Sequence, residues 1–495
     1  MADDSNEQIL AFVSGALPDV DFVLRGVEGR EELSSGFTYD LLLHRREGPL
    51  SEDQLDALMK GPVAIALGSG DDDVVHGILE SVELLDGTAA MGGRYVARVV
   101  PTTDALRLAQ SCRIYQNLDT AELIAAVLES YGLQKGKDFD LRIHAALPKR
   151  EYIVQYQESD WDFLQRWMEH EGFFYWYEHG SASETLVIAD ENEDATAIAA
   201  PTALSYRARN NMSTGGAATI WDWQLTQRRI AARVAVLDYN PLTPHVALVG
   251  KAEADVTHGF GSVFHYGEHF TTPEDGKRVA KLRAEQLRSE RRRYRALTDC
   301  ARFRVGHSFE LENHFDAQND GKYLITRLEI TVGAAISRQR TADEEREVSA
   351  YRARFTAVEF DVPFRPPRQT AWPRIDGVIH AHVAGDTSGE LSEIDDAGRY
   401  KVRLPFDGGG PKGAGSSRWV RMAQPYAGGG YGTHFPLHKG TEVLLAHIDG
   451  DPDRPVIVGS VPNAQTLSPA TRSNASQSVI QTAAGVRIEM EDNQG

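Results

Sequence analysis

The sequence has 495 residues, 41% of them hydrophobic, which is enough for about three domains with apolar cores and too much for a disordered chain. The formal net charge of −20 argues against nucleic-acid binding and against binding to anionic membranes, because both need a basic face. No apolar run reaches the ~18 residues that a membrane-spanning helix needs.

Cysteine content and the first residues indicate the compartment. The two cysteines, Cys112 and Cys300, lie far apart in sequence, so we expect no disulfide framework and a reducing cytosol. The start, residues 1–7, is acidic and lacks the basic and apolar segments of a signal peptide.

Residues 8–103 are expected to form β structure. Polar and apolar residues alternate in 21–25, 38–43 and 94–100, and glycine-containing turns separate these runs. The pattern predicts a barrel or a curved sheet.

Residues 104–200 are predicted to be α/β. One helix is expected over 119–131, with Asp119 and Glu122 as a cap-like pair. A second helix is expected to begin at Ser159, and its apolar and aromatic side chains, which we assign to a core rather than to a carbohydrate platform, are Trp161, Phe163, Leu164, Trp167 and Met168. Strands are predicted on either side, at 152–156 and 173–177.

Residues 201–360 return to strands around one strong helix. Thr272 and Pro273 have the pattern of an N-cap followed by a first-turn proline. The basic run Arg288–Arg295 is interpreted as the solvated end of this helix, with an acidic partner as the alternative. Strands are predicted at 323–330 and 351–359, and the proline-rich stretch 361–369 is interpreted as a linker.

Residues 370–463 are expected to form a small closed barrel of the oligonucleotide/oligosaccharide-binding (OB) type. Short apolar runs at 373–384, 400–404, 419–423, 443–448 and 456–461 are separated by turns rich in Gly, Asp and Pro. We expect Trp419 in the core of this barrel, and we expect the backbone of the glycine loop 428–432 to approach another surface closely.

The last residues have a different pattern. Residues 464–477 are rich in Ser, Thr and Ala and are interpreted as a connector. In 485–491 apolar and polar residues alternate, and a single strand of this kind needs partner strands to bury its apolar face.

Motif residues in two regions carry a family resemblance. In the barrel region these motif residues are Trp419, Gln424, Pro425, Gly428, Gly440, Glu442, Val443, Gly450, Asp451, Pro452 and Pro455. A second signature runs over 150–179 and includes Trp161 and Phe163. In order and spacing these motifs resemble VgrG, the family of type VI secretion spike proteins, which is related to the baseplate hub and needle proteins of contractile-tailed phages.

The resemblance implies a mainly β fold with α/β insertions. Tandem tube-like barrels are expected, the first in 8–103 and the second in 201–360, with the α/β insertion in 104–200 between them. The OB-fold domain follows the linker, and 478–495 would then be the truncated start of a trimeric β-helix needle.

The resemblance also implies a function and partners. A homotrimer would cap a hexameric, Hcp-like tail tube, contact baseplate proteins, and carry a PAAR-like tip protein and effectors. The protein would be assembled in the bacterial cytoplasm and exported without a signal peptide to the extracellular space or a target cell. It would contact the target membrane only transiently. No nucleic acid and no cofactor is expected.

Enzymatic alternatives have weaker support in the sequence. His265, Glu268 and His269 match the H-x-x-E-H pattern of one zinc-peptidase class, but the intervening Gly267 disfavours the helix that such a site needs. Asp449, Asp451 and Asp453 lack the remaining features of a calcium loop, so a rigid turn is preferred. Because no catalytic constellation is visible, we expect a non-enzyme. The alternatives are effector activity in a C-terminal extension and a carbohydrate-binding OB module.

Overall fold

The computed structural model describes residues 10–68, 73–88, 92–208, 218–336, 349–386, 388–407 and 418–492. The acidic start at 1–7 therefore lies outside the described residues. The chain forms two compact units that alternate along the sequence. The first comprises 1–108, 120–148 and 161–370, and the second comprises 109–119, 149–160 and 371–495. The finer domain boundaries given above remain predictions.

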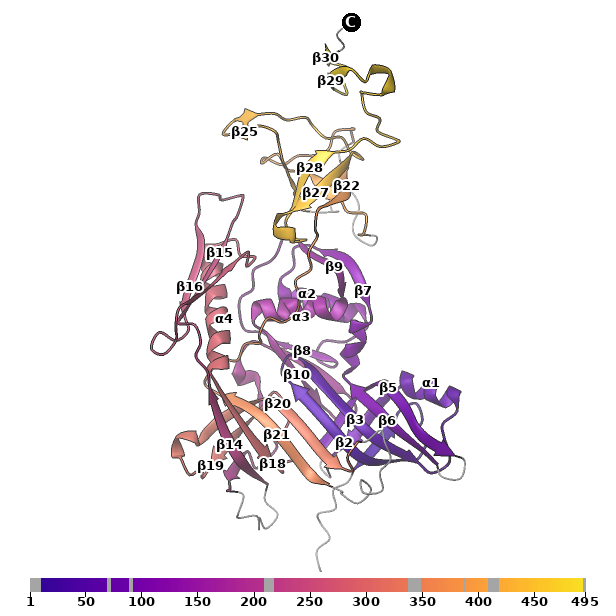
Figure 1. Cartoon of the computed structure of the whole chain (residues 1–495), viewed down its shortest axis with the longest axis vertical. Helices are drawn as coiled ribbons and strands as arrows, with labels where there is room; N and C mark the ends of the chain where they lie inside the picture. The colour runs from indigo at the N-terminus through magenta and orange to yellow at the C-terminus, as the bar shows by residue number, and fades with distance from the viewer. Residues whose placement is uncertain are drawn as a thin grey trace, which may run out of the picture. The chain divides into compact units, whose positions relative to one another are not determined.

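The first unit is built on a sheet of thirteen strands in the order β1-β4-β5-β6-β3-β2-β20-β21-β18-β14-β13-β19-β12 (Figure 1). The bounds of these strands are β1 Ala11–Ser14, β2 Phe22–Glu32, β3 Gly36–Arg45, β4 Pro62–Ala66, β5 Val74–Thr88, β6 Gly92–Val100, β12 Thr196–Ala197, β13 Ala203–Tyr206, β14 Thr219–Gln227, β18 Arg292–Thr298, β19 His307–Glu312, β20 Gly321–Gly333 and β21 Ser349–Glu359.

This sheet consists of two halves with six main strands each. In one half, β20 pairs with β19 as well as with β21, so the strands β20, β21, β18, β14, β13 and β19 return to their starting point and close a ring. The other half is formed by β1, β4, β5, β6, β3 and β2. The halves join along an antiparallel seam in which β2 pairs with β20 from Gly26–Gly333 to Glu32–Arg327. The tandem arrangement of β structure agrees with the predicted fold class.

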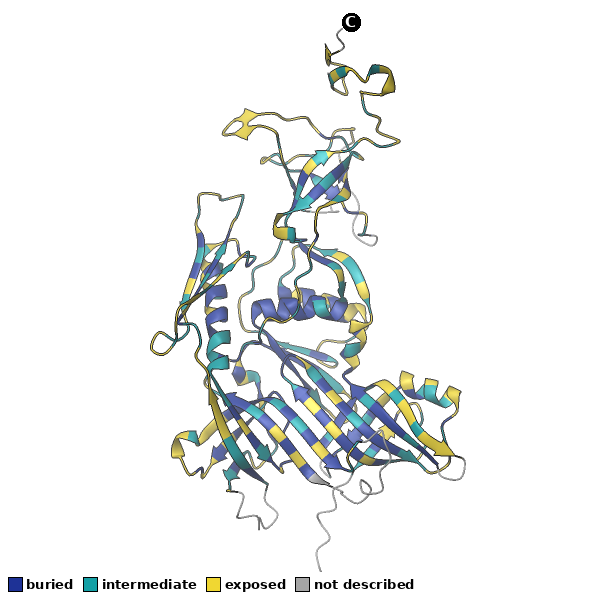
Figure 2. Ribbon diagram, in the orientation of Figure 1, coloured by how far each residue is buried: buried dark blue, intermediate teal, exposed yellow. Residues whose placement is uncertain are grey.

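Alternating burial explains why these sequences form a curved sheet. On β21, Ala353, Phe355 and Ala357 are buried, whereas the alternating Arg352 and Arg354 are exposed. Figure 2 shows the same change between buried and exposed residues along the neighbouring strands. One face of each strand therefore packs into a core while the other carries charge.

The α/β part of the first unit confirms both predicted helices. Helix α2 spans Thr120–Ser130 and α3 spans Asp160–Glu171, and Trp161 and Phe163 of α3 are buried as expected. A small sheet accompanies them in the order β10-β11-β8, with bounds β8 Phe139–Arg142, β10 Phe174–His179 and β11 Glu184–Ala189.

A second three-stranded sheet packs against helix α4, Pro273–Arg291. The strands are β15 Arg233–Asp238, β16 Leu248–Glu253 and β17 Ser262–Tyr266. Thr272 caps α4 as predicted, since its side chain accepts a hydrogen bond from the Asp275 N–H at 3.2 Å. The interpretation of the basic run as a helix end is only half correct. The helix stops at Arg291, and the rest of the run lies on β18, where Tyr294 and Ala296 alternate inward.

The remaining helices are short. Helix α1, Glu52–Lys60, has no counterpart among the predicted helices, and Ser51 caps it through a capping box with Gln54. In the part of the chain that the structure describes, the 3-10 helices include Thr102–Arg107, Asn192–Asp194, Ala317–Asn319, Ile448–Gly450 and Arg472–Asn474. Among the described residues, no helix is long and apolar enough to cross a membrane.

The second unit contains the expected small barrel. Its five strands are ordered β23-β22-β27-β28-β24, with bounds β22 Val378–Ala384, β23 Lys401–Arg403, β24 Arg421–Met422, β27 Glu442–His447 and β28 Pro455–Ser460. Tyr400 and Val420 exchange two backbone hydrogen bonds of 2.9 and 2.8 Å. This bridge joins the beginning of β23 to the beginning of β24 and closes the ring.

Two segments from earlier in the chain pack against this barrel. Strands β7, Gln110–Tyr115, and β9, Ile153–Ser159, pair with each other in the second unit. Tyr152 and Val154 belong to the same buried cluster as Ala381 and Val443 of the barrel. Two further hairpins are β25–β26, Ala427–Gly428 with Tyr431–Gly432, and β29–β30, Gln477–Gln481 with Arg487–Glu491.

The expected position of Trp419 in the core is wrong. Val420 is 1% exposed and points inward, so the alternation of the strand turns Trp419 outward, where it is only partly buried. The Trp419 ring lies 5.0 Å from the ammonium of Lys401, a cation–π contact at the barrel surface.

Candidate functional site

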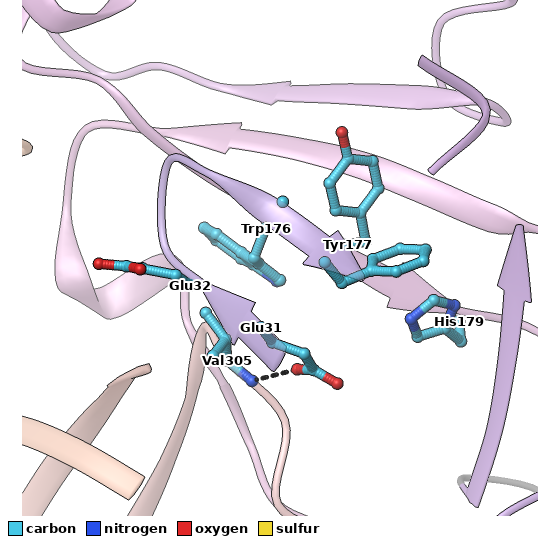
Figure 3. Close-up of a pocket in the computed structure, with 8 residues that line it drawn as sticks. Glu31, Glu32, Trp176, Tyr177, His179 and Val305 are labelled. Atoms are coloured by element: carbon cyan, nitrogen blue, oxygen red, sulfur yellow. Dashed lines mark hydrogen bonds between the residues drawn. The ribbon is translucent and has the colours of Figure 1, made fainter. Parts of the chain in front are cut away.

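A buried carboxylate, Glu31 on β2, lies where three parts of the first unit meet (Figure 3). It accepts hydrogen bonds from the Tyr39 hydroxyl and from the Val305 N–H, the latter at 3.0 Å. Its carboxylate lies 4.0 Å from Nε of Arg304, which is also buried. Burial, together with the Glu31 charge, holds the pKa of Tyr39 well above its ordinary value, so Tyr39 remains a hydrogen-bond donor.

Strand β10 forms the other side of this small pocket. Trp176, Tyr177 and His179 line it together with Glu31 and Val305 (Figure 3). Nδ1 of His179 accepts the N–H of His76 at 3.2 Å, and burial with the nearby Arg304 charge lowers the pKa of His179. The neutral His179 imidazole and the Glu31 carboxylate hold neighbouring segments in place through hydrogen bonds. The pocket therefore has a structural role.

The three predicted zinc candidates do not come together as one ligand set, although Nδ1 of His265 lies 3.9 Å from Oε1 of Glu268. His265 lies on β17 and accepts a hydrogen bond from Arg368 at 3.2 Å. Glu268 is buried between Arg283 and Arg368, at 3.0 and 2.8 Å. His269 has positive φ, and its ring packs edge-on against Trp167. The cluster is therefore an ion-pair network in which Glu268 pairs with Arg283 and Arg368.

A different group could hold a cation by geometry. His144, Asp190 and Asp194 place one ligand atom each within 4.8 Å of one another. Both oxygens of Asp190 already accept backbone N–H bonds, from His144 at 3.0 Å and from Ala145 at 2.8 Å. Asp194 accepts from the His144 ring at 3.0 Å, and this hydrogen bond raises the pKa of His144. Asp190 and Asp194 thus hold the segment His144–Ala145 in place through hydrogen bonds.

In the second unit, the predicted motif turn at Gly450–Pro455 organises the barrel. Pro452 and Pro455 are buried, and Asp451 pairs with Arg454 at 3.1 Å. Asp453 is 4% exposed and accepts the Val154 N–H of β9 at 2.6 Å. The aspartates of the turn therefore make protein contacts, in agreement with the rigid-turn interpretation, and Asp453 fastens β9 to the barrel.

The middle motif begins strand β27. Gly440 has a φ of +81°, which favours glycine at the turn before the strand, and Val443 is fully buried. Glu442 accepts hydrogen bonds from Asn463 at 2.8 Å and from His380 at 2.6 Å, and these contacts lower its pKa. The motif thus ties β22, β27 and the chain after β28 together.

The first motif leads into the glycine hairpin β25–β26. Gln424 is partly buried and Pro425 is exposed. A Cβ at Gly428 would lie 2.2 Å from the Tyr431 ring, so the close approach predicted for this loop occurs within the hairpin itself. Tyr426 and Tyr431 are 61% and 59% exposed and pack on each other at 5.4 Å.

Sequence reasoning missed Glu31 and the contact of Asp453 with β9. Glu31 stands in an otherwise ordinary strand, and its donors come from sequence positions as distant as Val305. The only available signal for Asp453 was its place in a Gly, Asp and Pro turn, which predicts a turn but not the strand that it binds.

Comparison with known proteins identifies the family. Residues 30–336 match the model of the phage tail baseplate hub (GPD) family, and residues 379–461 match the type VI secretion system/phage-baseplate injector OB domain. The chain is 28% identical to the type VI secretion system spike protein VgrG1a of Pseudomonas aeruginosa over 97% of this chain and 74% of that protein.

Solved structures show the same fold. The E. coli c3393 protein, described as a type VI secretion component similar to the T4 tail proteins gp27 and gp5, aligns with a TM-score of 0.66 at 20% identity, over 91% of this chain and all of that one. A chain of a Francisella PdpA–VgrG complex aligns with a TM-score of 0.62 at 8% identity, over 99% of this chain and 84% of that one. The chain belongs to the phage tail baseplate hub family and is a relative of the VgrG spike proteins of type VI secretion systems.

Proposed function

We propose that the chain is the structural spike of a contractile injection machine, in which a homotrimer caps the tube and punctures the target envelope. The observation that carries the proposal is the single sheet built from two halves of six main strands each. Three copies would present six such halves, which matches a hexameric, Hcp-like tube. The exposed apolar side chains of the C-terminal hairpin, Ile480, Ile488 and Met490, would be covered by the same hairpin of two other chains.

The partners and route follow from this proposal. The spike would be assembled in the bacterial cytoplasm, sit on baseplate proteins, carry a PAAR-like tip protein and effectors, and leave the cell without a signal peptide. The existence of a PdpA–VgrG complex supports the carriage of a partner protein. The chain itself would act mechanically, without enzymatic activity.

Two measurements test the proposal. Light scattering of the purified chain at micromolar concentration should give three chain masses of 54.6 kDa each, and a stable monomer that retains the β29–β30 hairpin would contradict it. Elemental analysis should find no stoichiometric zinc. Zinc that disappears when His265 and His269 are changed to Ala would instead favour an enzyme.

A further inference from the structure

The stretch before the barrel is bound to the first unit along its length. Asn192, which is 3% exposed, donates from Nδ2 to the carbonyl oxygens of Phe360 and Val362 at 2.8 Å each. Its Oδ1 accepts the N–H of Phe364 at 3.0 Å. One buried amide thus satisfies three backbone groups of a segment that follows the end of β21.

Arg365 fixes the middle of this stretch. Its Nε donates to Glu285 at 2.9 Å, and its Nη1 donates to the carbonyl oxygens of Gly172 and Asp190, the first at 3.2 Å. A Cβ at Gly172 would lie 3.0 Å from Cδ of Arg365, and the φ of Gly172 is +74°. The glycine that ends α3 therefore also leaves room for the passing chain.

Two more buried carboxylates hold the end of the stretch. Glu268 binds Arg368 at 2.8 Å and Arg283 at 3.0 Å. Glu169 on α3 accepts from the N–H groups of Gln369 and Thr370 at 2.9 and 3.0 Å, and from the Thr370 hydroxyl at 2.8 Å.

Apolar contacts support the polar ones. The Phe364 ring is buried and packs edge-on against Phe174, with ring centroids 5.5 Å apart. The Lys322 ammonium lies 3.6 Å from the centre of the Phe360 ring, and the Lys322 carbonyl accepts the Phe360 N–H.

The burial of charge separates this arrangement from a free linker. Glu169, Glu268 and Glu285 are each 3–4% exposed, and a buried carboxylate is costly unless charged or N–H donors surround it. Part of those donors come from 365–370. Removing this stretch would leave the three carboxylates short of partners, so it completes the packing of the first unit.

We propose that residues 360–370 form a strap that is fastened to the first unit. This strap fixes the point at which the chain leaves the first unit and transmits pulling force to Glu169, Glu268 and Glu285. The chain enters the second unit directly after Thr370. A free linker would stretch under load, whereas the strap resists until its charge-assisted hydrogen bonds break. The mechanical part of this inference rests on the proposed spike function, but the fastening itself does not.

Hydrogen exchange of the full chain, read by mass spectrometry, tests the fastening. In the unmodified chain the amides of Gln369 and Thr370 should be protected, because both are bound to Glu169. Glu169→Gln keeps the shape but loses the negative charge, so exchange at 369–370 should accelerate roughly tenfold to a hundredfold while α4 and β20 exchange as before. Glu274→Gln, an exposed carboxylate in the first turn of α4, is the matched control and should change nothing.

Because Glu169→Gln can also disturb α3, Arg368→Gln provides a change on the strap itself, where the Arg368 side chain is 31% exposed. It should accelerate exchange at the amides of 368–370 only, since Pro366 and Pro367 have no N–H. Unprotected amides at 369–370 in the unmodified chain, or unchanged exchange in both variants, would overturn the strap.

The force-bearing role is tested separately with the same variants in a secreting cell. Both variants should form the same oligomer as the unmodified chain and should deliver at least tenfold less effector. Normal delivery with a loosened strap would refute force transmission. If the unmodified chain does not form a trimer, the proposed function fails while the exchange result stands.

Discussion

The first and second units close their rings of strands in different ways. In the first unit, β19 and β20 pair over four residues on each strand, and the ring shares a further seam of seven pairs between β2 and β20. In the second unit the ring closes through the Tyr400–Val420 bridge. The ring in the large sheet therefore closes through a ladder of four residue pairs, whereas the small barrel closes through one bridge between the buried residues Tyr400 and Val420.

The largest effect should come from Tyr400→Ala. Tyr400 is fully buried, and its hydroxyl accepts the Leu437 N–H at 3.2 Å, so the change removes both a core aromatic ring and the support of the bridge. We expect the second unit to lose about 3–5 kcal/mol. In calorimetry of the full chain, the unfolding transition of the second unit should move to lower temperature, and that of the first unit should not change. Tyr426→Ala, at an exposed ring, is the control, and equal losses in the two variants would contradict the comparison.

A smaller effect is expected from Tyr39→Phe in the first unit. The change removes one donor to the buried Glu31, which should cost about 1–3 kcal/mol. The ring should remain closed because its strand pairing does not involve this hydroxyl. Urea unfolding measures the loss, and Tyr239→Phe, at a half-exposed ring, provides the reference. A loss of cooperativity in the first unit would show that its closure is as local as that of the barrel.

Acid should affect the barrel through His447. Burial lowers the pKa of His447 to about 4, although Asp451 opposes the shift. The ordinary pKa is near 6.5, so the unfolded state binds the extra proton first, and stability present above pH 6.5 is lost as the pH falls toward 4. After allowance for partial solvent exposure, we expect a loss of about 1–2 kcal/mol. In thermal scans between pH 7 and 4, the melting temperature of the second unit should fall less with pH in His447→Gln than in the unmodified chain. An identical pH dependence in the two chains would exclude His447 as the cause of the loss.

The smallest effect is expected at the surface of the barrel. Trp419→Ala removes a partly buried ring and its contact with Lys401, which should lower the free energy of unfolding by about 1 kcal/mol. Val420→Ala, one residue further along the strand, removes a fully buried side chain and should cost more. If Trp419→Ala is the more destabilising change in equilibrium unfolding, the inward-facing register given above is wrong.

Much of the fold could be predicted because its signals are local. The capped start of α4 at Thr272, the aromatic α3 with Trp161 and Phe163, and the alternation of β21 all appear in short sequence windows. The facing of Trp419 could not be predicted in this way, because a shift of one residue exchanges the two faces of a strand and leaves the apolar pattern almost unchanged.

The buried polar joints could not be predicted for another reason. Glu31 and Val305, or Glu169 and Thr370, meet only after the chain has folded, and neither partner has a sequence pattern of its own. For the same reason the sequence of the proline-rich stretch at 361–369 indicates only a linker. Composition shows that it is not helical, but not which buried carboxylates hold it.

We propose that three copies of the two-halved sheet build a ring with sixfold-like symmetry. End-on class averages of the purified chain in electron microscopy should show a closed ring with threefold symmetry and six similar lobes, two from each chain. Particles with one two-lobed hub, or a ring with another number of lobes, would contradict it.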